Sequence, residues 1–492
     1  MCDSRKRLEL MATFKGRLIV PYQHEGVEWL LNRELATKGP KGGFLCDEMG
    51  LGKTIQLIAI MIANARARTL IIVPKSIVNQ WKEEIARFAP GLNVAVFDGP
   101  DRTKNHEDLL SYHVIIAPYS VIVNKGKKTE QGRTILHQIQ WSRIILDEAH
   151  EIRSLSSKRH KAAVLFRSDI RWVVSGTPVF NSMKDFVSLC LFVGLTKNYV
   201  QAKTKEIRET LVLRRTKDDV SKFNQRLKLP PCDFQNIEID MYPDERRLYE
   251  SVFERNKDRI KELVRNSHNI GMHQMDILEC LLRVRQVMVH PQLYLSGIAT
   301  KNGYNPDVWN KGSQKLDKLI ELVNEHPREK TLIFCQFIKE MDMIQEQLVG
   351  MNIFRIDGSV SKDDRIMEIE GFKKIQDGAV FMIQIKAGGQ GLNLQEATRV
   401  YITAPSWNPA TELQAIARSH RTGQTAKVYV KKLVCSGDEM YPSVEESIMN
   451  LQGHKSTICA EVLNDPRIVG QIPTKTKNSG MTLGDILKIF QV

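Results

Sequence analysis

The sequence predicts an α/β protein with two lobes, each built on a parallel β-sheet that helices flank. Three observations predict this fold class. Short β-branched runs alternate with helical stretches over the first 215 residues, and the same alternation returns from about residue 312 to residue 450. The length of 492 residues also favours more than one domain, because a single hydrophobic core rarely serves so long a chain.

Four apolar runs in the first 215 residues are the candidate strands of the first lobe. Their near-continuous hydrophobicity is typical of strands that are covered on both faces, as in a parallel sheet. The runs are Thr69–Val73, His113–Ala117, Ser142–Leu146 and Arg171–Ser175. We therefore expect the first lobe to span residues 1–215.

Residues 216–311 are expected to form a linker and a helical insertion. Apolar residues recur at helical spacing within the charged segment Pro243–Arg265. A second helix is predicted over Met275–Val289, and it should end before Pro291 because a residue that precedes proline disfavours helical geometry.

The second α/β lobe is expected to span residues 312–450. Its candidate strands are Thr331–Cys335, Ile353–Ile356, Val380–Ile385 and Arg399–Thr403. Residues 451–492 are expected to form a C-terminal extension, with a polar linker around Pro473–Gly480 and a short amphipathic helix after Thr482. We expect the apolar face of that helix (Leu483, Ile486, Leu487 and Phe490) to pack onto a lobe, and docking to a partner is the alternative.

The composition of the chain indicates which kind of partner it binds and in which compartment it acts. The formal net charge of +14 favours polyanions, because cationic side chains neutralise phosphates and release counterions. A basic protein without such a partner is the alternative that charge alone leaves open. The eight cysteines include no CxxC pair, so neither a zinc module nor a disulfide framework is indicated. With no secretory signal and no apolar run of membrane-spanning length, we expect a soluble intracellular protein that binds no membrane.

The motif DEMGLGKT is the first candidate for phosphate chemistry. Gly50 and Gly52 permit a tight turn, so that backbone N–H groups and a helix N-terminus can face phosphate oxygens. Lys53 would reach the β- and γ-phosphates of ATP, and the Thr54 hydroxyl would bind Mg²⁺. Asp47 stands where the strict GxxxxGK[ST] pattern has its first glycine, so a glycine-rich turn with an unrelated lysine is the alternative.

A second motif, DEAH, follows the predicted buried strand Ser142–Leu146. A carboxylate at the C-terminal end of a strand lies where an α/β sheet presents its ligands. Asp147 would hold Mg²⁺, and Glu148 would orient and activate the attacking water. Downstream of GLGKT, this motif indicates a nucleotide-hydrolysing site.

Further motifs accompany these two in a fixed order. They are LIVPYQHEGVEWL at 18–30, LIIVPKSIVNQWKEEI at 70–85, VSGTPVFNS at 174–182, LRRTKDDV at 213–220, LPP at 229–231, LLRVRQVMVHP at 281–291, KTLIFCQF at 330–337, KAGGQGLNL at 386–394 and QAIARSHRTGQ at 414–424. Through these motifs, the chain resembles the Swi/Snf-type ATPases of helicase superfamily two over about residues 18–450. LRRTKDDV, LPP and LLRVRQVMVHP are similar to elements that simpler helicases of this superfamily lack.

The resemblance implies two tandem RecA-like lobes with a helical insertion between them and ATP bound in the cleft. Gln23 resembles a glutamine that reads adenine, and two motif arginines resemble arginine fingers that neutralise charge on the transferred phosphoryl group. The residues expected to bind ATP are Gln23, Asp47, Met49, Gly50, Leu51, Gly52, Lys53, Thr54, Gly391, Arg418 and Arg421. The catalytic residues would be Lys53, Asp147, Glu148, Arg418 and Arg421. The residues expected to couple the ATP state to lobe movement are His150, Ser175, Gly176 and Thr177.

The chain departs from the family pattern at two positions. Ala417 precedes Arg418 where the family usually has aspartate, and Ser406 precedes Trp407 where a second tryptophan is common. The missing carboxylate would affect the rate or regulation of the motor rather than the class of protein to which the chain belongs.

The resemblance also implies a DNA-binding groove that crosses both lobes. The residues expected to line it are Lys75, Ser76, Pro118, Tyr119, Ser120, Gln336, Lys386, Gly388, Gly389 and Trp407. Core packing is an equal alternative for Trp407, and for Trp81 it is the favoured interpretation. Lys125, Lys127 and Lys128 form a basic loop that would either add contacts or remain solvated.

We therefore expect a DNA-dependent ATPase that translocates along double-stranded DNA and remodels or displaces protein–DNA complexes. The alternatives are a strand-separating DNA or RNA helicase and an adaptor that has lost catalysis. ATP and Mg²⁺ are the expected cofactors. Double-stranded DNA is the expected partner ahead of single-stranded DNA or RNA, with nucleosomes or transcription and repair proteins as further partners. We expect a monomer that acts in the nucleus, or a virus-encoded protein that acts in the infected cell or virion.

Overall fold

The computed structural model describes most of the chain. The described residues are 13–18, 21–65, 68–123, 133–176, 183–223, 229–266, 273–385, 387, 392–407, 409–421, 423–450, 452 and 483–492. Their contacts form two compact units, and the main division falls between Lys228 and Leu229. We call these units the first and second lobes and describe each by itself. The described helices include none that is both long and apolar enough to cross a membrane.

The first lobe is built on a seven-stranded sheet whose strands are all parallel. Its order is β3-β4-β2-β5-β6-β1-β7. The strands are β1 (Lys41–Leu45), β2 (Thr69–Val73), β3 (Val94–Val96), β4 (Val114–Pro118), β5 (Gln140–Asp147), β6 (Arg167–Val174) and β7 (Val212–Leu213). The four strands predicted for this lobe are confirmed as β2, β4, β5 and β6.

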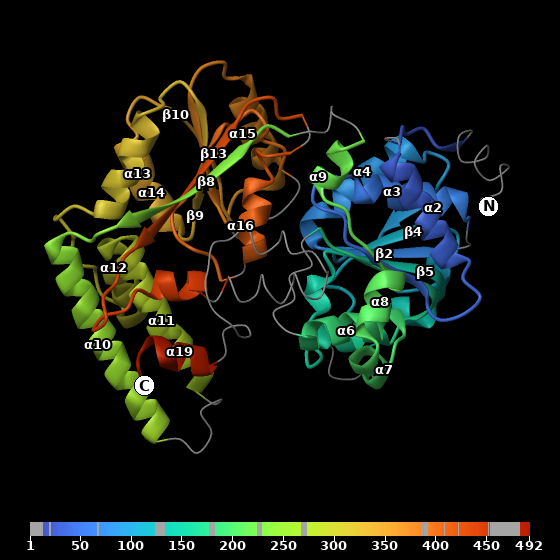
Figure 1. The fold of residues 1–492 in the computed structure, drawn as a ribbon, viewed down its shortest axis with the longest axis horizontal. Helices are drawn as coiled ribbons and strands as arrows, with labels where there is room; N and C mark the ends of the chain where they lie inside the picture. Colours follow the sequence, from blue (N-terminus) through green and yellow to red (C-terminus); the bar gives the residue numbers. More distant parts are fainter. Residues whose placement is uncertain are drawn as a thin grey trace. The chain divides into compact units, whose positions relative to one another are not determined.

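Helices cover both faces of this sheet (Figure 1). One face packs against α2 (Tyr22–Glu34), α3 (Lys53–Ala63) and α4 (Val78–Phe88). The other packs against α5 (Lys158–Val164), α6 (Met183–Val193), α7 (Lys197–Ala202) and α8 (Thr204–Leu211), and α9 (Lys217–Ser221) follows β7. Short 3₁₀ turns complete the lobe: η1 (Lys75–Ile77), η2 (Glu107–Leu109), η4 (Ile135–Gln138) and η5 (Ala149–Ile152).

The parallel register gathers the predicted site residues at one edge of the sheet. Leu45 and Asp147 both pair with Val174, and Val73 pairs with Pro118. These residues end β1, β5, β6, β2 and β4, so the segments that follow them emerge at the same edge. Those strand ends and segments hold DEMGLGKT, DEAH and four of the predicted DNA contacts, Lys75, Ser76, Tyr119 and Ser120.

The second lobe has a six-stranded parallel sheet of order β10-β11-β9-β12-β13-β8. Its strands are β8 (Cys232–Ile239), β9 (Lys330–Cys335), β10 (Asn352–Ile356), β11 (Ala379–Gln384), β12 (Arg399–Ile402) and β13 (Val428–Cys435). Its helices are α10 (Pro243–Arg265), α11 (Gln274–Val289), α12 (Pro291–Asn302), α13 (Gln314–Asn324), α14 (Ile338–Gln347), α15 (Lys362–Lys374), α16 (Pro409–Ile416) and α19 (Leu483–Ile489). Two parallel sheets flanked by helices confirm the predicted α/β class.

The sequence did not predict three of the longer strands, each for a local reason. The sequence of β1, KGGFL, lacks a β-branched run because two glycines occupy its middle. The sequence of β8, CDFQNIEI, is half polar because this strand lies at the edge of its sheet. Paired lysines interrupt β13, and the buried ammonium of Lys432 lies 2.8 Å from a carboxylate oxygen of Glu412. The structure groups β8, α10 and α11 with the second lobe, and the expected domain boundaries remain predictions.

The C-terminal helix packs onto the second lobe, as expected. Ile486, Ile489 and Phe490 are buried in the same core as α10 and α11. The Phe490 ring stacks on Phe253 of α10, with ring centroids 5.1 Å apart. Thr482, expected to cap this helix, lies outside the described residues, as does the expected linker at 473–480.

Truncation of Phe490 tests whether α19 is an integral part of this core. Phe490→Ala should lower the free energy of unfolding of the second lobe by about 3–5 kcal/mol, because it removes a fully buried ring. Lys488→Ala, on the exposed side of the same helix, is the matched control and should change it by less than about 0.5 kcal/mol. Urea unfolding followed by circular dichroism measures both, and a loss in Phe490→Ala as small as that of the control would show that α19 packs loosely.

Candidate functional site

The loop between β1 and α3 has the geometry of a phosphate-binding loop. Gly52 caps α3 in the left-handed region, at φ +72°, and a Cβ there would lie 2.5 Å from Nε2 of Gln23. Lys53 and Thr54 are the first residues of the helix. Because the first N–H groups of a helix have no partner within it, this turn presents donors to an anion.

Two side chains of α2 hold the loop from one side. The Tyr22 hydroxyl and Gln23 Nε2 each donate to the main-chain oxygen of Leu51, both at 3.1 Å. Burial and the charge of Asp47 raise the pKa of Tyr22 to about 12, so its hydroxyl stays protonated and can donate. Gln23 is thus buried against the loop, and its role in reading adenine remains a prediction.

A buried ion pair holds the loop from the other side. Asp47 is fully buried, and its Oδ1 accepts from the main-chain N of Arg215 at 3.1 Å and from Arg215 Nε at 3.0 Å. Its Oδ2 accepts from Arg215 Nη2 and, at 3.2 Å, from Gln56 Nε2. Arg215 also donates to the main-chain oxygen of Tyr22. The departure from the strict glycine pattern therefore has a structural function.

The neighbours of Arg215 anchor the same loop. Arg214 Nη1 donates to the main-chain oxygen of Cys46 at 2.8 Å and to that of Gly176 at 3.3 Å. The main-chain N of Lys217 donates to Glu48 Oε2 at 2.9 Å, and the Lys217 ammonium lies 3.5 Å from Glu48 Oε1. Sequence reasoning marked the LRRTKDDV segment but gave these side chains no contact with the phosphate loop.

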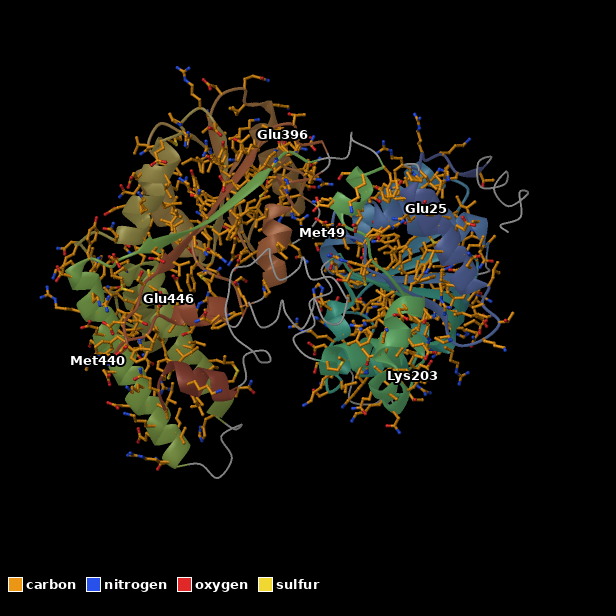
Figure 2. The ribbon with its side chains drawn as sticks, viewed as in Figure 1. Glu25, Met49, Lys203, Glu396, Met440 and Glu446 are labelled. Carbon is orange, nitrogen blue, oxygen red and sulfur yellow. The ribbon has the colours of Figure 1, made fainter. Side chains whose placement is uncertain are left out.

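Lys53 and Gly176 are in close proximity. The Lys53 ammonium donates to the main-chain oxygen of Asp47 at 2.9 Å. A Cβ on Gly176 would lie 2.6 Å from that ammonium and 2.6 Å from Cγ of Met49, which Figure 2 labels. Burial lowers the pKa of Lys53, and the negative charge of Glu148 opposes that shift. Gly176 therefore lies against the loop, while Thr177 is outside the described residues.

The two carboxylates of DEAH follow β5 directly. Asp147 Oδ1 accepts from the main-chain N of Glu148 at 2.9 Å, and Oδ2 accepts from the indole N–H of Trp81 at 2.8 Å. Glu148 adopts φ +49°, a left-handed conformation that is uncommon outside glycine and concentrated at functional sites. Glu148 Oε2 lies 3.4 Å from His150 Nδ1. Burial and the charge of Glu148 raise the pKa of Asp147 to about 6.

The predicted DNA contacts of the first lobe differ in exposure. Lys75, Ser76 and Ser120 are exposed, and the Lys75 ammonium lies 3.7 Å from Asp98. The Tyr119 side chain is buried, and its hydroxyl donates to the main-chain oxygen of Asp147 at 2.9 Å. The DNA contact at Tyr119 stays a prediction, and its ring packs in the core while its hydroxyl faces the DEAH segment. Trp81 is buried as expected, but its bond to Asp147 was not foreseen.

The predicted site residues of the second lobe occupy varied environments. Arg418 is buried, and Arg421 Nη1 lies 3.4 Å from the main-chain oxygen of Leu392. Gln336 Nε2 donates to the main-chain oxygen of Ala404 at 3.1 Å, and the guanidinium of Arg285 lies 4.7 Å from the centre of the Trp407 ring. The remaining predicted residues, Lys386, Gly388, Gly389 and Gly391, lie outside the described residues, as do Lys125, Lys127 and Lys128.

The elements that distinguish this chain from simpler helicases brace the same lobe. His420 Nε2 lies 2.8 Å from the main-chain oxygen of Pro230 in the LPP segment. Arg285 of α11 donates to the main-chain oxygen of Pro405 at 3.0 Å. Ser406, one of the two departures, is buried, and its main-chain N donates to Glu412 Oε1 at 2.7 Å. These contacts tie α11 to the segment before α16, and the LPP segment to the segment after α16.

Comparisons with known proteins identify the class. The model of the SNF2-related domain matches residues 22–293, and that of the helicase conserved C-terminal domain matches residues 314–423. The first match alone covers more than half of the chain. The chain therefore belongs to the SNF2-related family, which confirms the resemblance inferred from its motifs.

Individual relatives match this chain along most of its length. The chain is 30% identical to the putative ATP-dependent helicase/translocase YwqA of Bacillus subtilis, over 96% of this chain and 51% of the relative. It is 30% identical to the ISWI chromatin-remodeling complex ATPase ISW1 of Saccharomyces cerevisiae, over 91% of this chain and 41% of the relative. It is 27% identical to the probable global transactivator of Orgyia pseudotsugata multicapsid polyhedrosis virus, over 91% of each chain. The chain thus spans about half the length of the two cellular relatives and most of the viral one.

Removal of the titrating carboxyl of Asp147 tests its environment. The pKa of about 6 in the folded protein lies above the ordinary value of 3.8, so the folded chain retains a proton that the unfolded chain has released between those values. As the pH rises from about 4 to about 7, the free energy of unfolding of the unaltered chain should therefore fall by about 1–3 kcal/mol relative to that of Asp147→Asn. Urea midpoints of both proteins in EDTA measure this difference, and parallel pH curves would contradict it.

Loss of Arg215 tests the ion pair that holds the loop. Arg215→Met should lower the stability of the first lobe by about 3–5 kcal/mol, because it leaves the buried carboxylate of Asp47 without its cation. Adding Asp47→Asn to this variant should restore part of the loss. Arg87→Met, at an exposed arginine of α4, is the control. Thermal unfolding measures these proteins and Asp47→Asn alone, and a double variant whose loss equals the sum of the two single losses would argue against the pair.

Proposed function

We propose that this chain is a DNA-dependent ATPase that couples ATP hydrolysis to translocation along double-stranded DNA and so remodels or displaces protein–DNA complexes. The observation that carries this proposal is the arrangement at one edge of the first sheet. There the phosphate loop, Lys53, Asp147 and Glu148 lie together in a member of the SNF2-related family.

The residues of the loop suit ATP and Mg²⁺. Lys53 and the first N–H groups of α3 would neutralise and bind phosphate oxygens. The Thr54 hydroxyl and the Asp147 carboxylate are hard oxygen donors of the kind that Mg²⁺ prefers, and nucleotide phosphates commonly complete such a site. When bound, Mg²⁺ would screen the charge of the phosphates.

Glu148 is the proposed group that orients the attacking water. Its carboxylate faces His150 at 3.4 Å, and its left-handed backbone turns the chain away from β5 at that point. Gly176 lies against Lys53 and Met49. A shift of the main chain at Gly176 would therefore displace residues of the phosphate loop. Arg418, Arg421 and Gly391 are the proposed contributions of the second lobe to the transferred phosphoryl group, by resemblance to the family.

DNA is the proposed polyanion. The net charge of +14 supports this, as does the exposure of Lys75, Ser76 and Ser120 at the same sheet edge as the DEAH motif. Gln336, Trp407 and the segment from Lys386 to Gly389 are the proposed contacts of the second lobe. Main-chain and cationic contacts to phosphates would give binding with little sequence preference and strong dependence on salt.

The relatives suggest where such a motor would act. One is named as a chromatin-remodeling ATPase and another as a viral transactivator. We propose that nucleosomes or transcription and repair proteins on DNA are displaced by this chain, acting as a monomer. Its place of action would be the nucleus or the infected cell.

The ATPase assay tests the catalytic assignment. Steady-state hydrolysis stimulated by duplex DNA should fall at least about 100-fold in Lys53→Ala and in Glu148→Gln, because each removes a group that acts on the transition state. Lys203→Ala, at an exposed lysine of the first lobe, is the matched control and should keep the normal rate (Figure 2). Normal hydrolysis by Lys53→Ala would overturn the site.

The choice of nucleic acid in the same assay tests the motor class. Stimulation should be strongest with duplex DNA, weaker with single-stranded DNA or duplex RNA, and should decline as salt rises. Triplex displacement without separation of the duplex would support translocation. Strand separation would instead favour a helicase, and the absence of hydrolysis under every condition would favour an adaptor.

A further inference from the structure

Two aromatic side chains connect the expected DNA-contact segments of the first lobe to Asp147. Trp81 is 2% exposed, and its indole N–H donates to Asp147 Oδ2 at 2.8 Å. Tyr119 is also 2% exposed, and its hydroxyl donates to the main-chain oxygen of Asp147 at 2.9 Å. Both donors thus reach the same residue from elements that are distant in the sequence.

Trp81 belongs to a helix that begins beside exposed residues. It is the fourth residue of α4, and α4 follows η1, which contains Lys75 and Ser76. The helix packs against α3 and β4, and its hydrogen-bonded backbone joins Trp81 rigidly to its first turn. A phosphate held by Lys75 or Ser76 would therefore act on the indole through less than two turns of helix.

Tyr119 stands in an equivalent position after β4. Its main-chain N donates to the main-chain oxygen of Val73 at 3.0 Å, and the next residue, Ser120, is exposed. Burial raises the pKa of Tyr119 well above its ordinary value, so the hydroxyl remains a donor. A contact at Ser120 would act on the tyrosine across a single peptide unit.

Together these donors fix the orientation of Asp147. Its Oδ1 accepts from the main chain of Glu148, its Oδ2 accepts from Trp81, and its carbonyl oxygen accepts from Tyr119. Mg²⁺ demands near-ideal octahedral geometry, so the orientation of a carboxylate ligand affects its affinity. Donors to a metal-binding carboxylate typically change metal affinity or activity by about 10–100-fold.

We propose that Trp81 and Tyr119 are positioning residues that couple DNA binding at the first lobe to the Asp147 carboxylate. This inference rests on the proposed function and adds its regulation. DNA contacts at Lys75, Ser76 and Ser120 hold the two aromatic donors in place, and these donors hold Asp147 in the orientation that favours the magnesium–nucleotide complex. Because linkage is reciprocal, the magnesium–nucleotide complex tightens DNA binding by the same factor.

The test compares Trp81→Phe with Trp141→Phe. Trp81→Phe keeps an aromatic ring and removes the N–H donor to Asp147. Trp141 is also fully buried, and its indole donates at 2.9 Å to the main-chain oxygen of Leu136, so its replacement is the matched control. In the unaltered chain and in Trp141→Phe, MgADP should lower the Kd for duplex DNA by the same factor. In Trp81→Phe that factor should approach one, and the half-saturating Mg²⁺ concentration for basal hydrolysis should rise about 10-fold.

Fluorescence supplies a readout that does not depend on hydrolysis. The chain has six tryptophans, and the difference between the unaltered chain and Trp81→Phe isolates the emission of one indole. MgADP should change that emission, and the change should be preserved in Trp141→Phe. An emission change of equal size in Trp81→Phe would overturn the proposal.

Tyr119→Phe removes a single oxygen and keeps the inference falsifiable if Trp81→Phe folds poorly. It should also weaken the mutual effect of MgADP and DNA, with an unchanged midpoint of thermal unfolding within about 2–4 °C. Coupling that is intact in both folded variants would overturn the link and leave the proposed function standing. Absence of any DNA-stimulated hydrolysis in the unaltered chain would overturn the proposed function, and the link with it.

Discussion

The ion pair between Asp47 and Arg215 is the constraint on which the first lobe depends. The two residues are 168 positions apart, and every strand of the sheet except β1 lies between them in the sequence. Desolvation of two charges is expensive, and only the fork geometry and the added donors from Gln56 and the main chain offset it. The phosphate loop therefore reaches its final geometry only when the last segment of the lobe has docked.

Buried ion pairs also hold segments of the second lobe together. Lys315 and Glu445 form a buried pair at 2.6 Å, and Lys432 and Glu412 form another at 2.8 Å. Each carboxylate also accepts a main-chain N–H, from Cys435 and from Ser406. Buried polar groups that are fully satisfied specify one arrangement of neighbouring segments more sharply than apolar contacts do. They fix the segments around α16 and β13, and the motif QAIARSHRTGQ lies between these two elements.

The sequence predicted the parts of this protein whose signals are local. Continuous apolar runs such as Thr69–Val73 identified buried strands, and GLGKT and DEAH identified a site by residue type alone. What it missed depends on distant partners. Arg215 looks like a surface cation until β7 pairs with β1, and Trp81 looks like a core residue until α4 places its N–H against Asp147. Tyr119 was predicted to contact DNA from the family resemblance, and the packing that buries its ring just after β4 has no local signal in the sequence. Strands with glycines or paired lysines also carry no apolar run to detect.

The left-handed backbone of Glu148 has a consequence for the ways in which this position can change. Gly, Asn and Asp adopt a backbone at φ +49° far more readily than a β-branched residue does, whatever the chemistry of the side chain. The backbone conformation at Glu148 therefore limits which residues can replace it, independently of their effect on catalysis. Drift away from glutamate would pass most readily through short polar residues or glycine, which keep the turn between β5 and η5 intact. A chain that lost its activity in this way would retain the shape of its ligand pocket long after it had ceased to hydrolyse anything.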